Sequence, residues 1–138
     1  MLGARSFGSH SITGEVTPAQ VYADSVRYPA NTRPATVAVL ETPEGNFFGR
    51  ANFQDPILPE VQRVLDTVPE GIRERYHGGC AEIQCVNQAV GQNATLTESA
   101  ITTAKVRGDG GPHGIPHTPC PSCEIVLRAF GVRYYEPN

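Results

Sequence analysis

The stretch HGGCAEIQC, residues 77–85, places two cysteines, a histidine and a glutamate close together in the sequence. Apolar residues continue from it at helical spacing, at Ile83, Val86 and Val90. A helix is therefore predicted to begin at Cys80 and to stop at Gly91. Two interpretations of the stretch are open: a metal site with a catalytic carboxylate, or a redox or structural cysteine pair with charged neighbours.

A second pair of cysteines lies in PCPSC, residues 119–123, where a proline opens another predicted helix. Cys120 and Cys123 are about one helical turn apart, so both sulfurs can face one point at a zinc–sulfur distance of about 2.3 Å. The exposed amides and the dipole at a helix start favour thiolate over thiol. If the sheet brings this helix start to that of Cys80, three thiolates converge and leave open the fourth tetrahedral position that a catalytic zinc requires.

Glu82 follows Cys80 by two residues, close enough to reach a water molecule at such a zinc ion without being a ligand. Zinc lowers the pKa of that water toward neutrality, and a carboxylate can then move its protons. A glutamate in the first turn of a helix is also favoured by the helix dipole alone. Cys85 lies about 140° around the helix from Cys80, so we expect it to be a core thiol.

The rest of the chain predicts an α/β fold. A hairpin is expected from TVAVLET at 36–42 and FFGRANF at 47–53, joined by the turn PEGN. Apolar residues at i, i+3, i+4 and i+7 predict an amphipathic helix at 59–68. The other expected elements are a helix at 18–27, a strand at 99–108, a loop at 108–118, a helix at 119–130 and a strand at 131–135. A crossover helix then joins the last two strands, which makes them parallel.

Composition excludes several classes of protein. The 138 residues fit one domain, and no apolar run approaches the roughly 20 residues that span a bilayer, so we expect a soluble protein with no membrane partner. The net charge of −3 is not that of a protein that holds nucleic acid by charge alone, although the arginines and Lys105 can still form a local patch. No signal peptide is evident at the N-terminus, so export would require information outside this chain.

The motif HGGCAE, followed about 40 residues later by TPCPSC, resembles the zinc-dependent nucleic acid and nucleotide deaminase superfamily, and within it the YwqJ-like deaminases of bacterial polymorphic toxins. The resemblance implies a cytidine-deaminase-like three-layer α/β sandwich with a mixed sheet of four to five strands. We accordingly expect a leading helix and loose segment at 1–33 and a deaminase catalytic domain at 34–138. The later helix and fifth strand of the superfamily are expected to be missing or very short.

The resemblance also implies roles for individual residues. Glu82 matches the proton shuttle, and the ligands of Zn²⁺ match three cysteines: Cys80, Cys120 and Cys123. Substrate contacts are expected from five residues: His77, Asn52, His117, Ala81 and Pro119. A role without substrate is also open for three of these, because His77 can cap a turn or compete as a ligand, Asn52 can simply form a turn, and His117, like His113, can be solvated in its loop.

The predicted function is hydrolysis of cytosine to uracil in nucleic acid, with single- or double-stranded DNA as the favoured substrate. RNA and free cytidine nucleosides or nucleotides are the alternatives. The resemblance to toxins implies a secreted effector domain, monomeric, that acts in the cytoplasm of a target cell and has a cognate immunity protein as partner. The competing class is a non-catalytic zinc-stabilised interaction module, which predicts Cys85 or His77 as a fourth ligand.

Overall fold

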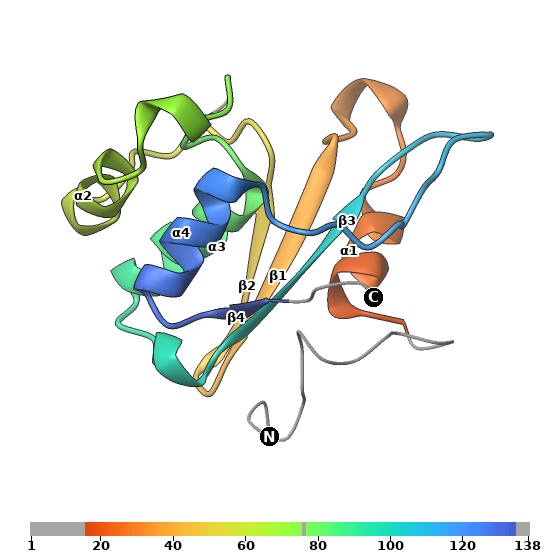
Figure 1. Ribbon diagram of the computed structural model, residues 1–138. Coiled ribbons are helices and arrows are strands. Elements are labelled where there is room, and N and C mark those ends of the chain that lie inside the picture. Colours follow the sequence, from red (N-terminus) through yellow and green to blue (C-terminus); the bar gives the residue numbers. More distant parts are fainter. Residues whose placement is uncertain (1–15, 76, 135–138) are drawn as a thin grey trace.

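The fold is a mixed sheet of four strands with helices on both faces (Figure 1). The computed structural model describes residues 16–75 and 77–134. The strands are β1 (Thr36–Thr42), β2 (Gly45–Arg50), β3 (Ala100–Lys105) and β4 (Arg133–Tyr134), in the spatial order β2-β1-β3-β4. β1 is antiparallel to both of its neighbours, whereas β3 and β4 are parallel, which confirms the prediction from the crossover helix.

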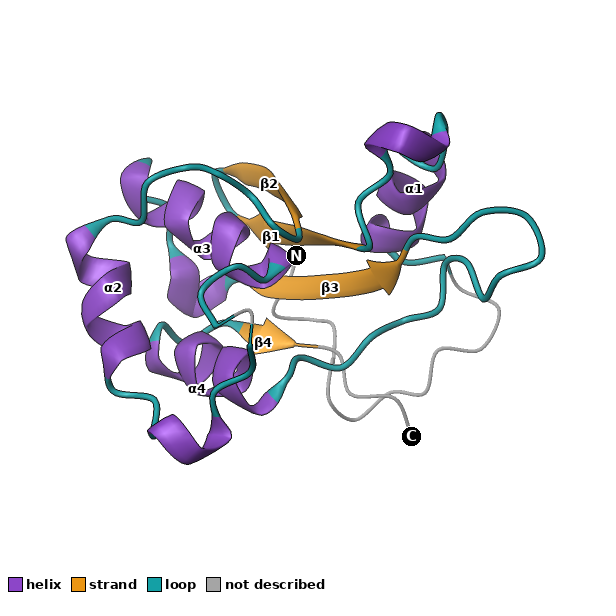
Figure 2. Cartoon of the chain, turned by 90° about the horizontal axis from the view of Figure 1, so that it is seen from above, coloured by secondary structure: helices purple, strands orange, loops and turns teal. Residues whose placement is uncertain are grey.

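The helices form two layers (Figure 2). One face of the sheet carries α1 (Pro18–Ser25), and the other carries α2 (Pro59–Asp66), α3 (Ala81–Gly91) and α4 (Pro121–Ala129). Three short 3-10 turns are also present: η3 (Ala30–Thr32), η4 (Glu70–Ile72) and η5 (Leu96–Glu98). The predicted three-layer α/β sandwich is confirmed. No helix within 16–75 or 77–134 is long and apolar enough to cross a bilayer.

β1 is one of the two inner strands and is buried on both faces. Val37 and Val39 pack toward α1 in one apolar cluster, and Ala38 and Leu40 pack toward α2, α3 and α4 in the other. This alternation follows from the pleat, which sends successive side chains to opposite faces. The same alternation on β3 sends Thr103 toward α3 and Thr102 toward α1.

The hairpin is tighter than predicted, and the predicted strand at 47–53 is wrong at both ends. Thr42 pairs with Gly45, so β2 starts two residues earlier. It also stops before Asn52, which has the left-handed φ of 63° and donates its N–H to the Gly79 carbonyl oxygen at 2.8 Å. The chain therefore leaves the sheet in order to contact the segment that precedes α3.

Other boundaries shift by a few residues. α3 includes Gly91, the predicted stop, and the left-handed residue beyond the helix is Asn93, with φ of 57°. The strand predicted at 99–108 ends at Lys105, where the chain folds back and the Lys105 N–H donates to the Ile115 carbonyl at 3.0 Å. The predicted helices at 18–27, 59–68 and 119–130 are each shorter in the structure. The end of the predicted closing strand, residue 135, lies outside the described residues.

β2 lies directly against the start of α3 because residue 49 is a glycine. A Cβ atom on Gly49 would be 2.1 Å from the Ala81 carbonyl oxygen and 2.8 Å from the Cys85 sulfur. No heavy atoms approach so closely without displacement, so a side chain here would push α3 away from the sheet. The glycine therefore helps to fix where α3 begins.

Candidate metal centre

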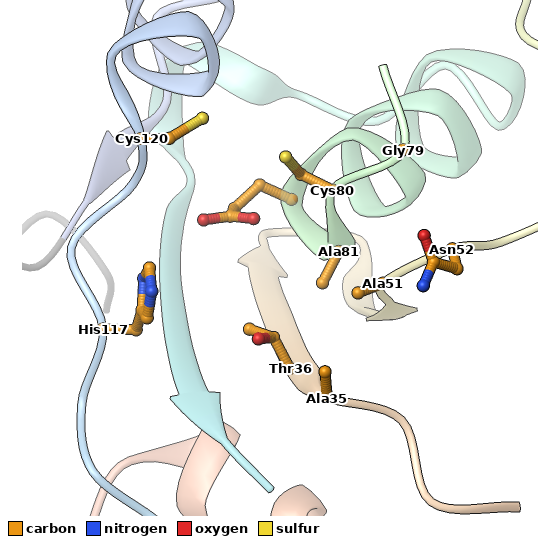
Figure 3. A pocket seen from close by; sticks show the side chains of 10 residues that line it. Ala35, Thr36, Ala51, Asn52, Gly79, Cys80, Ala81, His117 and Cys120 are labelled. Carbon is orange, nitrogen blue, oxygen red and sulfur yellow. The ribbon is translucent and has the colours of Figure 1, made fainter. Parts of the chain in front are cut away.

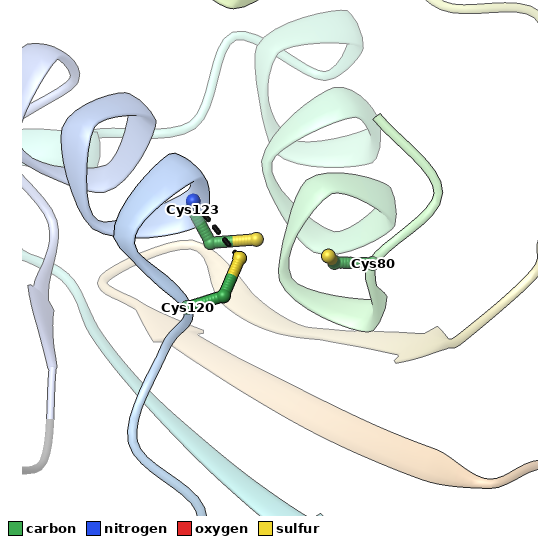
Figure 4. Close-up of side chains that lie close together, drawn as sticks. All are labelled: Cys80, Cys120 and Cys123. Atoms are coloured by element: carbon green, nitrogen blue, oxygen red, sulfur yellow. Dashed lines mark hydrogen bonds between the residues drawn. The ribbon is translucent and has the colours of Figure 1, made fainter. Parts of the chain in front are cut away.

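Three cysteine sulfurs converge where α3 and α4 begin (Figure 4). The sulfurs of Cys80, Cys120 and Cys123 all lie within 4.8 Å of one another. Cys80 is the N-cap residue of α3 and Cys120 that of α4, so the two helix starts face each other across this point. The sequence predicted that the three sulfurs converge if the sheet joins the two helix starts. The structure shows this convergence.

Local backbone conformation explains why both helices begin at a cysteine. Cys80 has φ −74° and ψ 152°, and Cys120 has φ −66° and ψ 162°, both in the extended region typical of N-cap residues. Pro121 occupies the first helical position, where its missing N–H costs nothing. The Cys120 sulfur accepts a hydrogen bond from the Cys123 N–H at 3.4 Å and so caps its own helix.

The three thiols shift one another's pKa values. Hydrogen bonds from the thiols of Cys123 and Cys80 hold the pKa of Cys120 below its usual range. The same interactions with Cys120 raise the pKa of Cys80 and of Cys123. A soft metal ion can replace these shared protons, because it binds thiolates and releases protons as it binds.

The geometry fits an ion with one open position. In the described parts of the chain, no further His, Cys, Asp or Glu side chain joins the three cysteines as a ligand. Cys85, one of the two alternatives for a fourth ligand, is fully buried and its sulfur lies 3.5 Å from the carbonyl oxygens of Ala38 and Phe47. It is a core thiol, as predicted.

Glu82 lies in the first turn of α3 and is only 4% exposed. Burial raises the pKa of its carboxyl group to about 7. The Thr103 hydroxyl, from β3, lies 3.5 Å from Glu82 Oε2 and is directed at the carboxylate. A carboxyl group with such a pKa can both accept and donate a proton near neutral pH, which is what a proton shuttle requires.

A pocket of about 230 Å³ is lined by two of the three cysteines and by the buried carboxylate (Figure 3). Its lining contains Cys80, Cys120 and Glu82, together with three of the predicted substrate-contact residues: Asn52, Ala81 and His117. The volume is below the roughly 300–1,000 Å³ of sites that enclose drug-sized ligands. The pocket therefore suits one small ring more than an extended molecule.

Asn52 meets the conditions of both interpretations that the sequence left open. Its left-handed backbone makes it a turn residue, and its side chain also lies at the pocket. Left-handed φ values are tolerated by asparagine better than by most residues. The sequence could not show which role holds, because the same residue meets both conditions.

His117 lines the pocket, and one nitrogen of its ring is unusual. The backbone N–H of His117 donates to the Thr103 carbonyl oxygen at 2.9 Å, which holds the loop against β3. Its Nδ1 atom is buried, and the described part of the chain offers it no hydrogen-bond partner. Buried polar atoms without a partner are rare in folded proteins, so this nitrogen retains an unused capacity for a hydrogen bond.

His77 has its partners inside the protein. Its Nδ1 lies 2.6 Å from the Ser122 hydroxyl and its Nε2 lies 3.1 Å from the Leu65 carbonyl oxygen. Neither His77 nor Pro119 is among the residues that line the pocket, and the predicted substrate contact of both stays a prediction. What the structure shows is that His77 ties the end of α2 to the residue between the two cysteines of α4.

His113, the other loop histidine, is engaged away from the pocket. Its Nδ1 accepts from the Arg107 N–H at 3.0 Å, and its Nε2 lies 2.8 Å from a carboxylate oxygen of Asp24 on α1. It therefore attaches the loop to the helix on the opposite face of the sheet. The alternative of a merely solvated histidine is wrong for His113.

The sequence did not reveal several residues of the site. Thr103 and Ser122 contact Glu82 and His77, and Ala35, Thr36, Ala51 and Gly79 contribute to the pocket lining. The signal for Thr103 was present, because AITTAK places hydroxyl groups on a strand that is otherwise apolar. Ser122 is the polar residue inside PCPSC, but its partner could not be read from spacing.

Comparison with known proteins adds one finding. The family model of YwqJ-like deaminases matches residues 27–132. The matched span contains all three cysteines of the cluster, Glu82 and the whole pocket lining. No curated protein and no solved structure gives a significant match to the chain.

Proposed function

The chain belongs to the YwqJ-like deaminase family, and from this premise we propose that it is a zinc-dependent enzyme that hydrolyses cytosine to uracil in nucleic acid. One observation carries the proposal: a buried glutamate, Glu82, shares a small pocket with Cys80 and Cys120 of the three-sulfur cluster. A structural metal site has no use for a carboxylate of this kind in an adjoining cavity.

Zinc is the ion that fits best. Three sulfur donors at two helix starts match its preference for thiolate ligands, and the lack of a fourth protein donor in the described residues matches catalytic sites. Bound there, zinc supplies Lewis acidity that makes water a better nucleophile at neutral pH. Three thiolates donate more charge than a histidine and two thiolates, so Glu82 must take a larger share in activating the water.

Glu82 carries the protons of the proposed reaction. It takes one proton from the attacking water and gives it to N3 of the cytosine ring while the water oxygen bonds to C4. It then takes the remaining hydroxyl proton and gives it to the amino group, so the bond from C4 to the amine breaks and ammonia leaves. Uracil results, and Glu82 returns to its starting state.

The pocket supports a single base as the reacting group. Its volume suits one ring, and Asn52 and His117 offer polar groups at its lining. A base within a duplex cannot reach such a cavity unless it is flipped out, whereas a base in a single strand can enter directly. We favour DNA as the polymer, because the family resemblance is to toxins that damage it.

The resemblance to toxin deaminases also supports a biological setting. We propose that the chain is the effector domain of a secreted polypeptide and acts as a monomer in the cytoplasm of a target cell. A cognate immunity protein would then block the pocket. Copurification of the chain with the product of a neighbouring gene, and relief of toxicity by that product, would test this part separately.

A substrate panel tests the proposed activity. The purified chain is incubated with single-stranded DNA, double-stranded DNA, RNA and CMP, all containing cytosine, and uracil and ammonia are measured. We expect equal amounts of uracil and ammonia from DNA. Activity on CMP alone would redirect the proposal to free nucleotides, and no uracil from any substrate would overturn it in favour of a non-catalytic zinc module.

A further inference from the structure

Basic residues gather at one end of the sheet, although the chain as a whole is acidic. Lysine and arginine number 11 and the net charge is −3. A group of them, here called the basic rim, lies where β1 begins and where β2 and β3 end: Arg27, Arg33, Arg50, Lys105 and Arg107. A local patch of this kind was open from the sequence, but only the strand register brings its members together.

The basic rim borders the candidate pocket. Arg107 Nη1 donates to the Ala35 carbonyl at 2.7 Å, and Ala35 lines the pocket. Arg50 immediately precedes Ala51, another lining residue. In Figure 3, Ala35 and Ala51 lie at the end of the pocket that is away from Cys120. The contact of Arg107 with Ala35 therefore places the rim at this end of the pocket, away from the sulfur cluster. Arg50 is opposite Val37, which packs toward α1, so its side chain continues the rim onto the α1 face of the sheet, where it binds the Tyr22 hydroxyl.

Lys105 lies on the pocket face of the sheet. It is directly opposite Thr36, which lines the pocket. Thr103, two residues earlier in β3, contacts Glu82, and alternate residues of a strand share one face. Directly opposed side chains are about 4.5–5.5 Å apart at Cβ, so the lysine side chain begins beside a residue that lines the pocket.

Neutral groups hold the guanidinium groups of the rim in place. Arg27 Nε donates to the Arg107 carbonyl at 2.8 Å, and Arg33 Nε donates to the Arg27 carbonyl at 2.7 Å. Arg50 Nε donates to the Tyr22 hydroxyl at 2.9 Å. Within residues 16–75 and 77–134, no ion pair joins a rim residue to a carboxylate. The guanidinium groups of the rim are thus held in position by groups that do not neutralise their positive charge.

Carboxylates near the rim already have other partners. Asp24 lies 2.8 Å from His113 Nε2, and Asp109 accepts a hydrogen bond from the Tyr28 hydroxyl. The ring of Tyr28 lies 5.5 Å from the Arg27 guanidinium and 5.4 Å from that of Arg33, and the residue is 54% exposed. An exposed aromatic ring beside arginines is a surface on which an unpaired base can stack.

We propose that the basic rim binds the phosphate groups of a polynucleotide on either side of the base that enters the pocket. This rests on the proposed function for the identity of that base, and it adds the residues by which the chain selects a polymer over a free nucleoside. Guanidinium groups bind phosphate oxygens in bidentate geometry. Arginines already held by carbonyl groups lose little side-chain entropy when they bind.

The test compares two doubly substituted proteins that lose the same charge. Arg50→Gln with Lys105→Gln removes two rim cations, and Arg63→Gln with Arg128→Gln removes two cations from α2 and α4. Binding of a fluorescein-labelled single-stranded DNA, and of an RNA of the same sequence, is measured by anisotropy at several salt concentrations. A third protein, Arg50→Lys with Lys105→Arg, keeps both charges and shows whether the positions tolerate substitution.

We expect the rim variant to bind the labelled strands at least tenfold more weakly, with the α2 and α4 control and the charge-preserving variant close to wild type. The slope of log affinity against log salt should fall by about 1.4, since each lost phosphate contact in a single strand contributes about 0.7. If the rim variant loses more affinity for DNA than for RNA, or more for RNA than for DNA, the larger loss identifies the preferred polymer. Either result supports phosphate binding by the basic rim.

Equal affinity and equal salt dependence for the rim variant and the control would overturn the proposal that the basic rim binds phosphate groups. The proposal would also be overturned if the wild-type protein bound neither polymer. These outcomes are distinct from failure of the proposed function, which is the absence of uracil from every substrate with wild-type protein. Circular dichroism of the three variants verifies that a loss of binding is not a loss of fold.

Discussion

The two helix starts that form the metal centre are held in different ways. The start of α3 is fixed by backbone contacts. Gly49 lies so close to the Ala81 carbonyl oxygen that a Cβ atom would not fit, and the Asn52 N–H donates to the Gly79 carbonyl. The start of α4 is fixed by side chains, because His77 links Ser122 to the carbonyl of Leu65. One half of the site is therefore built into the sheet packing, and the other half depends on a small hydrogen-bonded network.

The halves also differ in what they contribute. The α3 start provides one sulfur and the buried carboxylate, whereas the α4 start provides two sulfurs and no carboxylate in the pocket. Damage to the α3 start should therefore affect both metal binding and proton transfer. Damage to the α4 start should affect metal binding first.

The largest effect is expected from the ligands themselves. Cys80→Ser, Cys120→Ser and Cys123→Ser should each lower zinc affinity by more than the roughly 10–100-fold typical of lost outer-shell partners. Cys85→Ala is the matched control, since its sulfur is buried in the apolar core and lies 3.5 Å from the backbone carbonyl oxygens of Ala38 and Phe47. Zinc content after dialysis against a chelator measures the difference. Loss of zinc from Cys85→Ala alone would show that the wrong sulfurs have been assigned.

The backbone-held half can be broken without touching a ligand. Gly49→Ala should lower the free energy of unfolding by about 1–3 kcal/mol, because the added methyl group overlaps the Ala81 carbonyl. Gly71→Ala is the control, since a Cβ there meets no atom within 4 Å. Urea denaturation gives both values. If the two variants are equally stable, the close contact between β2 and α3 is not what holds α3.

The side-chain-held half predicts coupling between two residues. His77→Ala leaves the buried Ser122 hydroxyl, 2% exposed, without its partner, at a cost of about 1–3 kcal/mol. With Ser122→Ala already present, the added cost should be smaller, and the coupling energy should be about 0.5–3 kcal/mol. Zinc affinity should fall in parallel while substrate KM for the zinc-loaded protein changes little. A raised KM at full zinc occupancy would instead support the predicted substrate contact.

The smallest effect on stability is expected at Asn52. Asn52→Gly keeps the left-handed backbone and should change the free energy of unfolding by no more than about 0.5 kcal/mol, whereas Asn52→Ala should cost about 1–2 kcal/mol. Any loss of turnover in Asn52→Gly then reports the missing side chain at the pocket. Unchanged kinetics in this variant would leave Asn52 with its turn role only.

The order of the main helices and strands and the pairing of Cys120 with Cys123 could be predicted, because both depend on local signals. Helix starts are marked by capping and proline residues, and one turn of helix sets the distance between Cys120 and Cys123. Cys80 could be joined to them because a resemblance supplied the pairing. Spacing in the sequence alone did not bring these helix starts together.

What could not be predicted depends on contacts between distant segments. The end of β2 is decided by a hydrogen bond from the Asn52 N–H to the Gly79 carbonyl, and one partner of His77 is the carbonyl of Leu65 on α2. The basic rim exists only in the register that places Lys105 opposite Thr36. Such pairings are tertiary, and no single stretch of sequence contains both members.

The most direct measurement is zinc content and uracil formation in the same preparation of wild-type protein and Glu82→Gln. We expect about one zinc ion per chain in both proteins. Wild type should convert cytosine to uracil in single-stranded DNA, and Glu82→Gln should be slower by about 10²–10⁴-fold, because it lacks the group that moves protons. Uracil formation by Glu82→Gln at the wild-type rate would contradict the account.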